Sequence, residues 1–278
     1  MNAEDLNPVI LYYSITLFFV GLACLFHHVI LSKKTPSIGH EFKLDPWRIR
    51  GLDLALFLTF IFLFISGAGA ITLEGYKIIF NTEVIPDEHS FVFGYPMHIA
   101  ILVSLYGFFR YYKQGNDVPL NPVRQGLTTL ILRSIYFFFA AIPILLAGGY
   151  IWPILLEFLN LPTDPQDLVT QVEEMGISPV LFFVAFLAVV VAPISEELLF
   201  RAFIYRSLKT YVSPTLSAVL TSLMFAGMHL NLLSFLPLFL LGLWLCRTYE
   251  KTGNIFVPII FHGLFNGNTL LVLMLIST

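Results

Sequence analysis

The stretch LTTLILRSIYFFFAAIPILLAGGYIWPIL, from Leu127 to Leu155, decides the fold class of this chain. Arg133 is its only charged side chain, and the stretch exceeds the roughly 17 to 25 residues that a helix needs to cross a bilayer. Similar runs recur along all 278 residues, of which 57% are hydrophobic and 12% charged, with a mean hydropathy of +0.82. A soluble domain of this size needs more charge on its surface, so lipid must be the solvent for most of this one.

Windows of this kind predict an all-α protein, a polytopic transmembrane bundle of about eight helices. They cover Val9–Leu31, Leu52–Thr72, Phe91–Phe109, Leu127–Leu155, Ser178–Lys209, Ser213–His229, Leu232–Arg247 and Ile255–Ile276. Residues 1–278 are expected to form a single membrane domain. Within it, residues 178–278 carry the motifs described below, and residues 1–177 supply accessory helices with an external polar loop near 161–176.

The positive residues test this division, because they collect on the cytoplasmic side of membrane proteins. With the N-terminus outside, the inner loops and helix ends hold every Lys and Arg except Lys77, that is 14 of the 15. The outer segments instead carry acids: Glu74, Glu83, Asp87, Glu88, Asp164, Asp167, Glu173 and Glu174. We therefore expect an integral, multi-pass protein with both termini extracytoplasmic, in a bacterial or archaeal plasma membrane.

Several function classes and features are disfavoured at this stage. No basic patch suggests nucleic acid as a partner, and membrane lipids are expected to be the main neighbours. Cys24 and Cys246 lie in separate apolar runs and offer neither a disulfide framework nor a CxxC metal site. The first apolar run follows acidic residues rather than a basic segment, so we interpret it as a retained helix and not as a signal peptide.

Ionisable and amide side chains interrupt three of the last four spans. They are Glu196, Glu197 and Arg201 in APISEELLFRAF, His229 in MFAGMH, and His262 and Asn266 in FHGLFNGN. Such residues are costly inside a bilayer and are therefore a functional hypothesis by default. Arg201 follows Glu197 by four residues on the same helical face, so this pair is expected to fix the face and keep the second carboxylate charged.

Depth decides whether these groups can meet. If the fifth and sixth spans form a hairpin that turns at Tyr211–Pro214, Glu196 lies 15 residues before Tyr211 and His229 lies 15 after Pro214. Both are then about 22 Å from the turn, at 1.5 Å per residue. His262 lies about seven residues into the last span, or some 10 to 12 Å. It is expected to be shallower unless that helix begins earlier or tilts.

The chemistry that such a set supports is hydrolysis. A carboxylate in a poorly solvated pocket is a usable general base, so Glu196 would take a proton from water. His229 would help to hold that water, while His262 and Asn266 would donate hydrogen bonds to the oxyanion of a tetrahedral intermediate.

The same residues resemble a known family. E-E-x-x-x-R at Glu196, Glu197 and Arg201, F-x-x-x-H at Phe225 and His229, and H-x-x-x-N at His262 and Asn266 are similar to the three motifs of the CAAX prenyl protease and bacteriocin-processing family, also called CPBP or Abi. The motifs appear in the right order, each on its own predicted helix, and no motif position departs from the pattern. The resemblance covers about Ser178–Thr278, while the first four helices add only hydrophobicity to it.

The resemblance implies an intramembrane glutamate-type endopeptidase that acts on membrane-bound proteins or peptides, prenylated ones among them. The catalytic set it implies is Glu196, His229, His262 and Asn266, supported by Glu197, Arg201 and Phe225. The family is also classed as metalloendopeptidase, so zinc held by Glu196, His229 and His262 stays open. We favour a site without metal, because HExxH is absent and Asn266 suits an oxyanion donor better than a zinc ligand.

Two other functions compete with the protease. A non-catalytic scaffold or bacteriocin-immunity protein would keep the same fold and use its cavity to bind a partner. A small transporter would use the carboxylates as a proton relay, but the chain lacks the repeated broken helices of such proteins. His98 stands alone in the third span and is interpreted as an interfacial or packing histidine. Ser195 is not expected to be a nucleophile, because GxSxG is absent.

Overall fold

The computed structural model describes most of the chain. The described residues are 8–31, 44–83, 85–86, 89, 92–112, 120, 123–166, 169–170, 172 and 178–276. Outside them lie the predicted inner residues Lys33, Lys34, Lys43 and Lys113, the predicted outer residues Asp87, Glu88, Asp167, Glu173 and Glu174, and much of the predicted loop 161–176.

Eight helical rods make up the described part of the chain, which contains no strand. They are α1 (Pro8–Phe26) with its extension η1 (His27–Leu31), α2 (Gly51–Phe80), α3 (Gly94–Tyr112), α4 (Leu127–Phe158), a composite rod over Pro179–Leu208, α9 (Pro214–Gly227), α10 (Leu232–Thr252) and α11 (Phe256–Ile276). Each rod overlaps one of the predicted windows, although α2 and α10 end later than predicted, so the all-α fold with about eight helices is confirmed.

The composite rod is the fifth along the chain and alternates between α-helical and π-helical segments. It consists of α6 (Pro179–Phe186), η3 (Leu187–Val191), α7 (Ala192–Glu196), η4 (Glu197–Tyr205) and α8 (Arg206–Leu208), where η denotes a π-helical segment. A π-helix has hydrogen bonds from residue i to i−5 and often marks a functional site. Both glutamates lie where the second π segment begins.

Six of the described rods are long and apolar enough to cross a membrane. They are Val9–Ile30, Gly51–Phe80, Leu127–Phe158, Pro179–Leu208, Leu232–Thr252 and Phe256–Ile276. The rod α9 is apolar but short, with 14 residues. Large apolar side chains such as Ile71, Ile78 and Phe158 point outward and are 76%, 79% and 81% exposed. Such a surface is stable in lipid and not in water, so the chain is an integral multi-pass membrane protein.

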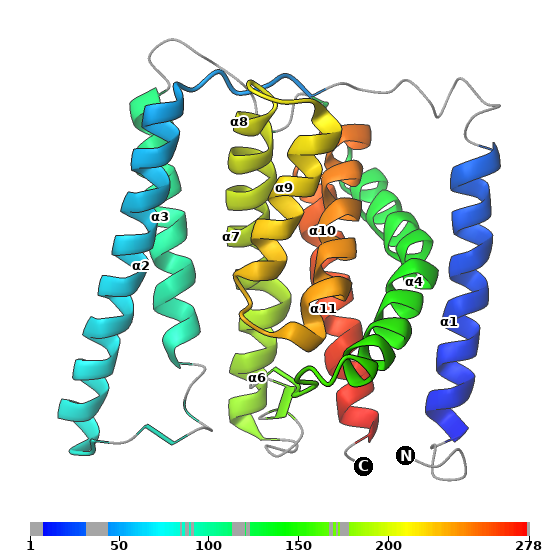
Figure 1. Cartoon of the computed structure of the whole chain (residues 1–278), viewed down its shortest axis with the longest axis horizontal. Helices are drawn as coiled ribbons and strands as arrows, with labels where there is room; N and C mark the ends of the chain where they lie inside the picture. The colour runs from blue at the N-terminus through cyan, green and yellow to red at the C-terminus, as the bar shows by residue number, and fades with distance from the viewer. Residues whose placement is uncertain are drawn as a thin grey trace.

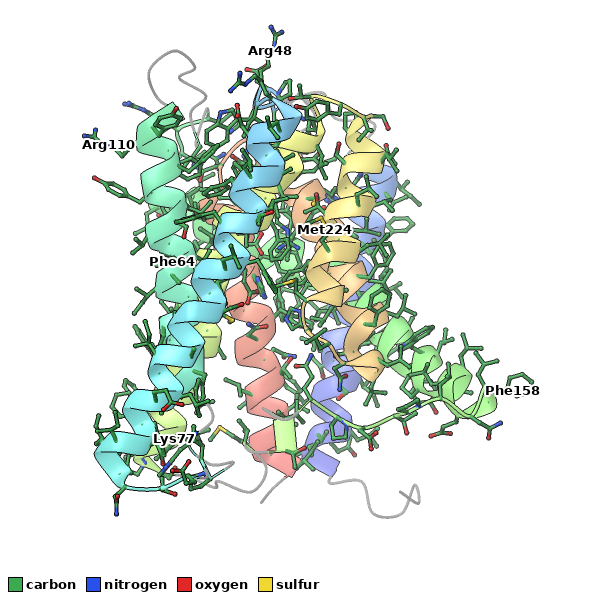
Figure 2. All side chains as sticks on the ribbon, turned by 60° about the vertical axis from the view of Figure 1, so that its left-hand side comes forward. Arg48, Phe64, Lys77, Arg110, Phe158 and Met224 are labelled. Atoms are coloured by element: carbon green, nitrogen blue, oxygen red, sulfur yellow. The ribbon has the colours of Figure 1, made fainter. Side chains whose placement is uncertain are left out.

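Three cationic residues labelled in Figure 2 lie at the ends of the bundle where the sequence places them. Arg48 and Arg110 lie at one end and Lys77 at the other (Figure 2). The first residues of α1 and the last residues of α11 lie together, at the end where α2 finishes (Figure 1). The arrangement agrees with an even number of crossings, while the side of the membrane that each end faces stays a prediction.

The rods that carry the motifs lie in the middle of the molecule. The hairpin of α2 and α3 flanks them on one side, and α4 followed by α1 flanks them on the other (Figure 1). The core between these rods is rich in phenylalanine and includes Phe137, Phe138, Phe203, Phe225 and Phe261. Their burial leaves little room to shift one rod against another, because protein interiors are close-packed.

The described segment 44–50 is hydrogen-bonded to the C-terminal end of the composite rod. Arg206 Nε donates to the Asp45 carbonyl at 3.0 Å, and Lys209 Nζ donates to the Leu44 carbonyl at 2.6 Å. Lys209 also forms an ion pair with Glu250 of α10 at 2.8 Å. Because these bonds join three separate stretches of chain, they fix the position of the composite rod along its axis relative to α10.

A glycine lets α11 approach the composite rod closely. A Cβ built on Gly263 would lie 2.6 Å from the carbonyl oxygen of Val189, a backbone atom that cannot move aside. One turn later, a Cβ on Gly267 would meet only Val189 side-chain atoms at 3.8 and 3.9 Å, which is ordinary contact. The neighbouring residue His262 therefore reaches the composite rod only because position 263 has no side chain.

We predict that Gly263→Ala lowers the stability of the detergent-solubilised protein, while Gly267→Ala does not. Overpacking of this kind costs about 1 to 3 kcal/mol. Alanine also favours a helix over glycine by about 1 kcal/mol, equally at both sites, so the pair is matched. Thermal unfolding of the two variants measures the difference. Equal melting temperatures would contradict the close approach of α11.

Candidate functional site

Pro193, which lies just before the two glutamates, interrupts the backbone hydrogen bonding of the composite rod. The Ala192 N–H donates to the Leu187 carbonyl, five residues back. The next bond of this type would run from residue 193 to the Ala188 carbonyl, but proline has no N–H. Asn266 of α11 replaces it, since its Nδ2 donates to the Ala188 carbonyl at 2.7 Å. Asn266 of the H-x-x-x-N motif therefore supplies the hydrogen bond that the backbone of the π segment lacks.

Glu197 and Arg201 form a fully buried ion pair. Arg201 Nη1 donates to Glu197 Oε1 at 2.8 Å, and both side chains are 0% exposed. The Arg201 guanidinium also lies over the ring of Phe225, 4.4 Å from its centroid. The i, i+4 pairing expected from the sequence is thus present, and Phe225 of α9 closes over it.

The pair is not fully satisfied. Glu197 Oε2 and Arg201 Nε are buried without a hydrogen-bond partner among the described residues. A buried ion pair is weak evidence for stability because both ions must be desolvated, and unpaired buried polar atoms add to that cost. The arrangement therefore favours a role in positioning other groups over a role in holding the fold together.

His262 lies between the two glutamates. Its Nδ1 is 2.8 Å from Glu197 Oε1 and its Nε2 is 3.8 Å from Glu196 Oε2. Because an ionised carboxylate only accepts hydrogen bonds, Nδ1 carries the proton and donates to Glu197. Nε2 is then turned toward Glu196, whose side chain is 15% exposed while that of His262 is 3% exposed.

His229 lies in the turn after α9, which ends at Gly227. Its Nδ1 donates to the Phe225 carbonyl at 2.8 Å, because a carbonyl can only accept. Its ring packs edge-on against the Phe225 ring, with centroids 5.0 Å apart, and the His262 ring also packs edge-on against Phe225, at 5.7 Å. Phe225 thus contacts both histidines, and its carbonyl orients His229, which gives a reason for the pairing of Phe225 with His229 in the motif.

The structure brings most of the predicted set together. Glu196, Glu197, Arg201, Phe225 and His262 form one group of direct contacts. His229 joins it through Phe225. Within the described chain no hydrogen bond links His229 or Asn266 to either glutamate; Asn266 instead lies one turn along α11 from His262, bound to Ala188.

The sequence leaves open whether His262 is shallower than Glu196 or whether its helix starts earlier or tilts. Its two contacts put it level with both glutamates. The reason is that α11 begins inside the protein: Asn254 and Ile255, in the turn before it, are only 3% and 2% exposed. That turn is covered by residues 123–125, since Asn254 Nδ2 donates to the Val123 carbonyl and Gln125 Nε2 to the Thr252 carbonyl. Because α11 starts at a buried turn, His262 reaches the two glutamates although it lies only about seven residues into the helix.

Sequence reasoning missed the surroundings of His98. Its ring is buried in α3, and Nδ1 lies 2.6 Å from Ser195 Oγ, next to Glu196. Glu196, His229 and His262 all act electrostatically on His98. The interpretation of His98 as a lone packing residue is therefore incomplete. A histidine in an apolar span was the only signal, and its distance along the chain from the motifs concealed its position.

The donor set can be tested against a metal ion. Over the described residues, no three His, Cys, Asp or Glu side chains lie close enough together to hold one metal. The Nδ1 atoms of both histidines are held by an oxygen acceptor, as in many zinc sites, while each ring packs against Phe225. In this arrangement Glu196, His229 and His262 do not form a zinc site.

We predict that Arg201→Met strongly destabilises the protein, because it leaves the Glu197 carboxylate buried and without its cation. Removing one partner of a buried pair costs about 3 to 5 kcal/mol. Arg50→Met is the control, since Arg50 pairs with Asp53 at 2.8 Å but its side chain is 83% exposed, and exposed pairs contribute at most about 1 kcal/mol. Melting temperatures in detergent compare the two; equal losses would mean that burial of the pair is not important.

Part of the chain is similar to a known protein family. No curated protein and no solved structure matches the chain. Residues 178–268 match a sequence family described as type II CAAX prenyl endopeptidase Rce1-like, and this segment holds the composite rod, α9, α10 and the part of α11 with both of its motif residues. The resemblance seen in the motifs is thereby confirmed: over residues 178–268 the chain is similar to the type II CAAX prenyl endopeptidase (CPBP) family.

Proposed function

We propose that this protein is an intramembrane endopeptidase in which Glu196 activates water. The observation that carries the proposal is the position of Glu196, a partly exposed carboxylate in an apolar span, 3.8 Å from the Nε2 of a histidine that a second carboxylate orients. A single water can hydrogen-bond to both atoms across such a distance. The family description, an endopeptidase, supports the same reaction class.

In the proposed reaction, Glu196 takes a proton from this water as the oxygen attacks the scissile carbonyl. The proton then passes from Glu196 to the leaving amine. His229 presents the ring nitrogen that the Phe225 carbonyl leaves unused and helps to hold the water. Glu196 is thus base in the first step and acid in the second, and it returns to the carboxylate at the end of the cycle.

The oxyanion is stabilised from α11. His262 already uses its Nδ1 proton on Glu197, so it donates through Nε2 only as the doubly protonated imidazolium. Glu197 Oε1 lies 2.8 Å from the Nδ1 of His262 and accepts from Arg201 at the same distance. Asn266 has a second amide proton besides the one bound to Ala188, and this proton is the further donor.

The substrate is proposed to be a membrane-bound protein or peptide. The site lies between apolar rods, and a substrate reaches it most readily from the lipid that surrounds them. The family description names CAAX prenyl proteins, so a peptide with a prenylated cysteine near its C-terminus is the first substrate to test.

We predict that Glu196→Gln abolishes proteolysis and leaves the fold intact. Glutamine has the shape of glutamate but cannot take the water proton, so loss of activity reports the base. The measurement compares membrane peptidomes of cells that express the intact protein or the variant, and adds cleavage of an internally quenched CAAX peptide with and without a farnesyl group.

The matched control is Glu157→Gln, which changes an exposed glutamate at the end of α4. It should cleave like the intact protein. Unchanged turnover by Glu196→Gln would end the proposal, and a Glu196→Gln protein that retains full activity in cells would favour the scaffold or immunity function.

We further predict that proteolysis does not need a metal. Dialysis of the detergent-solubilised protein against EDTA should leave the cleavage rate within about twofold of the untreated protein, because no three His, Cys, Asp or Glu side chains of the described residues lie close enough together to hold one metal ion. Loss of activity that zinc restores, and that magnesium does not, would instead assign Glu196, His229 and His262 as ligands that gather around the ion.

A further inference from the structure

His98 connects α3 to the residue beside the proposed base. It belongs to the third rod, 80 residues before the segment 178–268 that matches the family. Its ring is 4% exposed, and its Nδ1 lies 2.6 Å from Oγ of Ser195, which is 0% exposed. Ser195 immediately precedes Glu196 in α7. Burial of two polar side chains in an apolar bundle costs free energy unless they form hydrogen bonds.

The direction of this hydrogen bond follows from the proton count. The Ser195 hydroxyl has a single proton and donates it to the Ala192 carbonyl at 3.0 Å. Ser195 Oγ can therefore only accept from His98, so Nδ1 carries the proton and donates. Nε2 of the neutral ring is then a bare acceptor, and no hydrogen bond joins it to another group in the described residues.

His98 faces the proposed site. The ionisable groups that act on it are Glu196 of α7, His229 beyond α9, and His262 of α11, which are the groups proposed to handle the water and the oxyanion. The other polar tie between α3 and the composite rod is Tyr95, whose hydroxyl donates to the Phe183 carbonyl at 2.7 Å. Tyr95 makes its contact in α6, before the π segment, whereas His98 makes its contact directly at the proposed base.

We propose that His98 is a positioning residue of the site, which holds Ser195 and the turn with Glu196 at the distance from His262 that proteolysis requires. This inference rests on the proposed function of Glu196. It also changes the role of the first four rods, since α3 becomes part of the site and not only an accessory helix.

The need for such a tie comes from the composite rod itself. Pro193 and two π segments weaken its backbone bonding on both sides of Glu196. Asn266 fastens the rod before Pro193, at Ala188, and His262 fastens it after Glu196, at Glu197. His98 supplies the third point of attachment, between these two. A misplacement of about 1 Å at a reacting group can cost about 100-fold in rate.

The test uses two amide variants that differ in which ring nitrogen they replace. The asparagine amide nitrogen occupies the place of Nδ1, and the glutamine amide nitrogen that of Nε2. His98→Asn should therefore keep the bond to Ser195 and stay within about threefold of wild-type kcat, while His98→Gln should lose about 10- to 100-fold in kcat with KM unchanged. The probe is the quenched, farnesylated CAAX peptide.

Two further variants separate positioning from packing. Ser195→Ala should lose as much kcat as His98→Gln, and the double variant should lose no more than either single one, since both break the same bond. Tyr95→Phe removes the neighbouring tie and should leave kcat unchanged. Full activity in His98→Gln or Ser195→Ala, or rescue by glutamine and not by asparagine, would overturn the proposal.

A spectroscopic measurement decides the inference without activity. In NMR spectra of protein labelled with ¹⁵N-histidine, His98 should show a protonated Nδ1 and a bare Nε2. Ser195→Ala should disturb Nδ1, and Glu196→Gln should shift Nε2. A proton on Nε2 in the intact protein would refute the inference. If wild-type protein fails to cleave the peptide but these signals appear, the proposed proteolysis fails while the tie between His98 and Ser195 stands.

Discussion

The structure of the site depends on one buried carboxylate. Glu197 Oε1 accepts hydrogen bonds from Arg201 on its own rod and from His262 on α11, both at 2.8 Å. A carboxylate in an apolar bundle is stable only when paired and hydrogen-bonded, so these contacts draw α11 and the composite rod together. Phe225 of α9 then covers the cation. Three of the rods are thus arranged around a single negative charge.

The two neighbouring glutamates differ because of this arrangement. Glu197 is fully buried and orients His262, while Glu196 is left partly exposed and faces the other nitrogen of the same ring. Adjacent residues on a helix point about 100° apart, so one can serve structure while the other meets water. Phenylalanines of the core supply the hydrophobic surroundings of the two glutamates and exclude competing polar groups.

Irregular backbone is the second device of the site. An uninterrupted α-helix would use the Ala188 carbonyl internally, whereas Pro193 leaves it for Asn266. Gly263 lets α11 come near enough for that bond, because a Cβ there would collide with the Val189 carbonyl. The motif residues and the irregular segment therefore depend on each other: the π segment exposes a backbone acceptor, and the partner helix supplies the side chain that satisfies it.

The sequence by itself determined the helical rods, their order and the residue types of the site. Apolar runs and spacings of four are local patterns, and the bilayer makes them unusually informative. Two features were decided only by the tertiary structure. The depth of His262 depends on how residues 123–125 cover the start of α11, and the place of His98 depends on which face of α3 packs on α7. Both are contacts between distant stretches of chain, and they follow from packing, which no local pattern encodes.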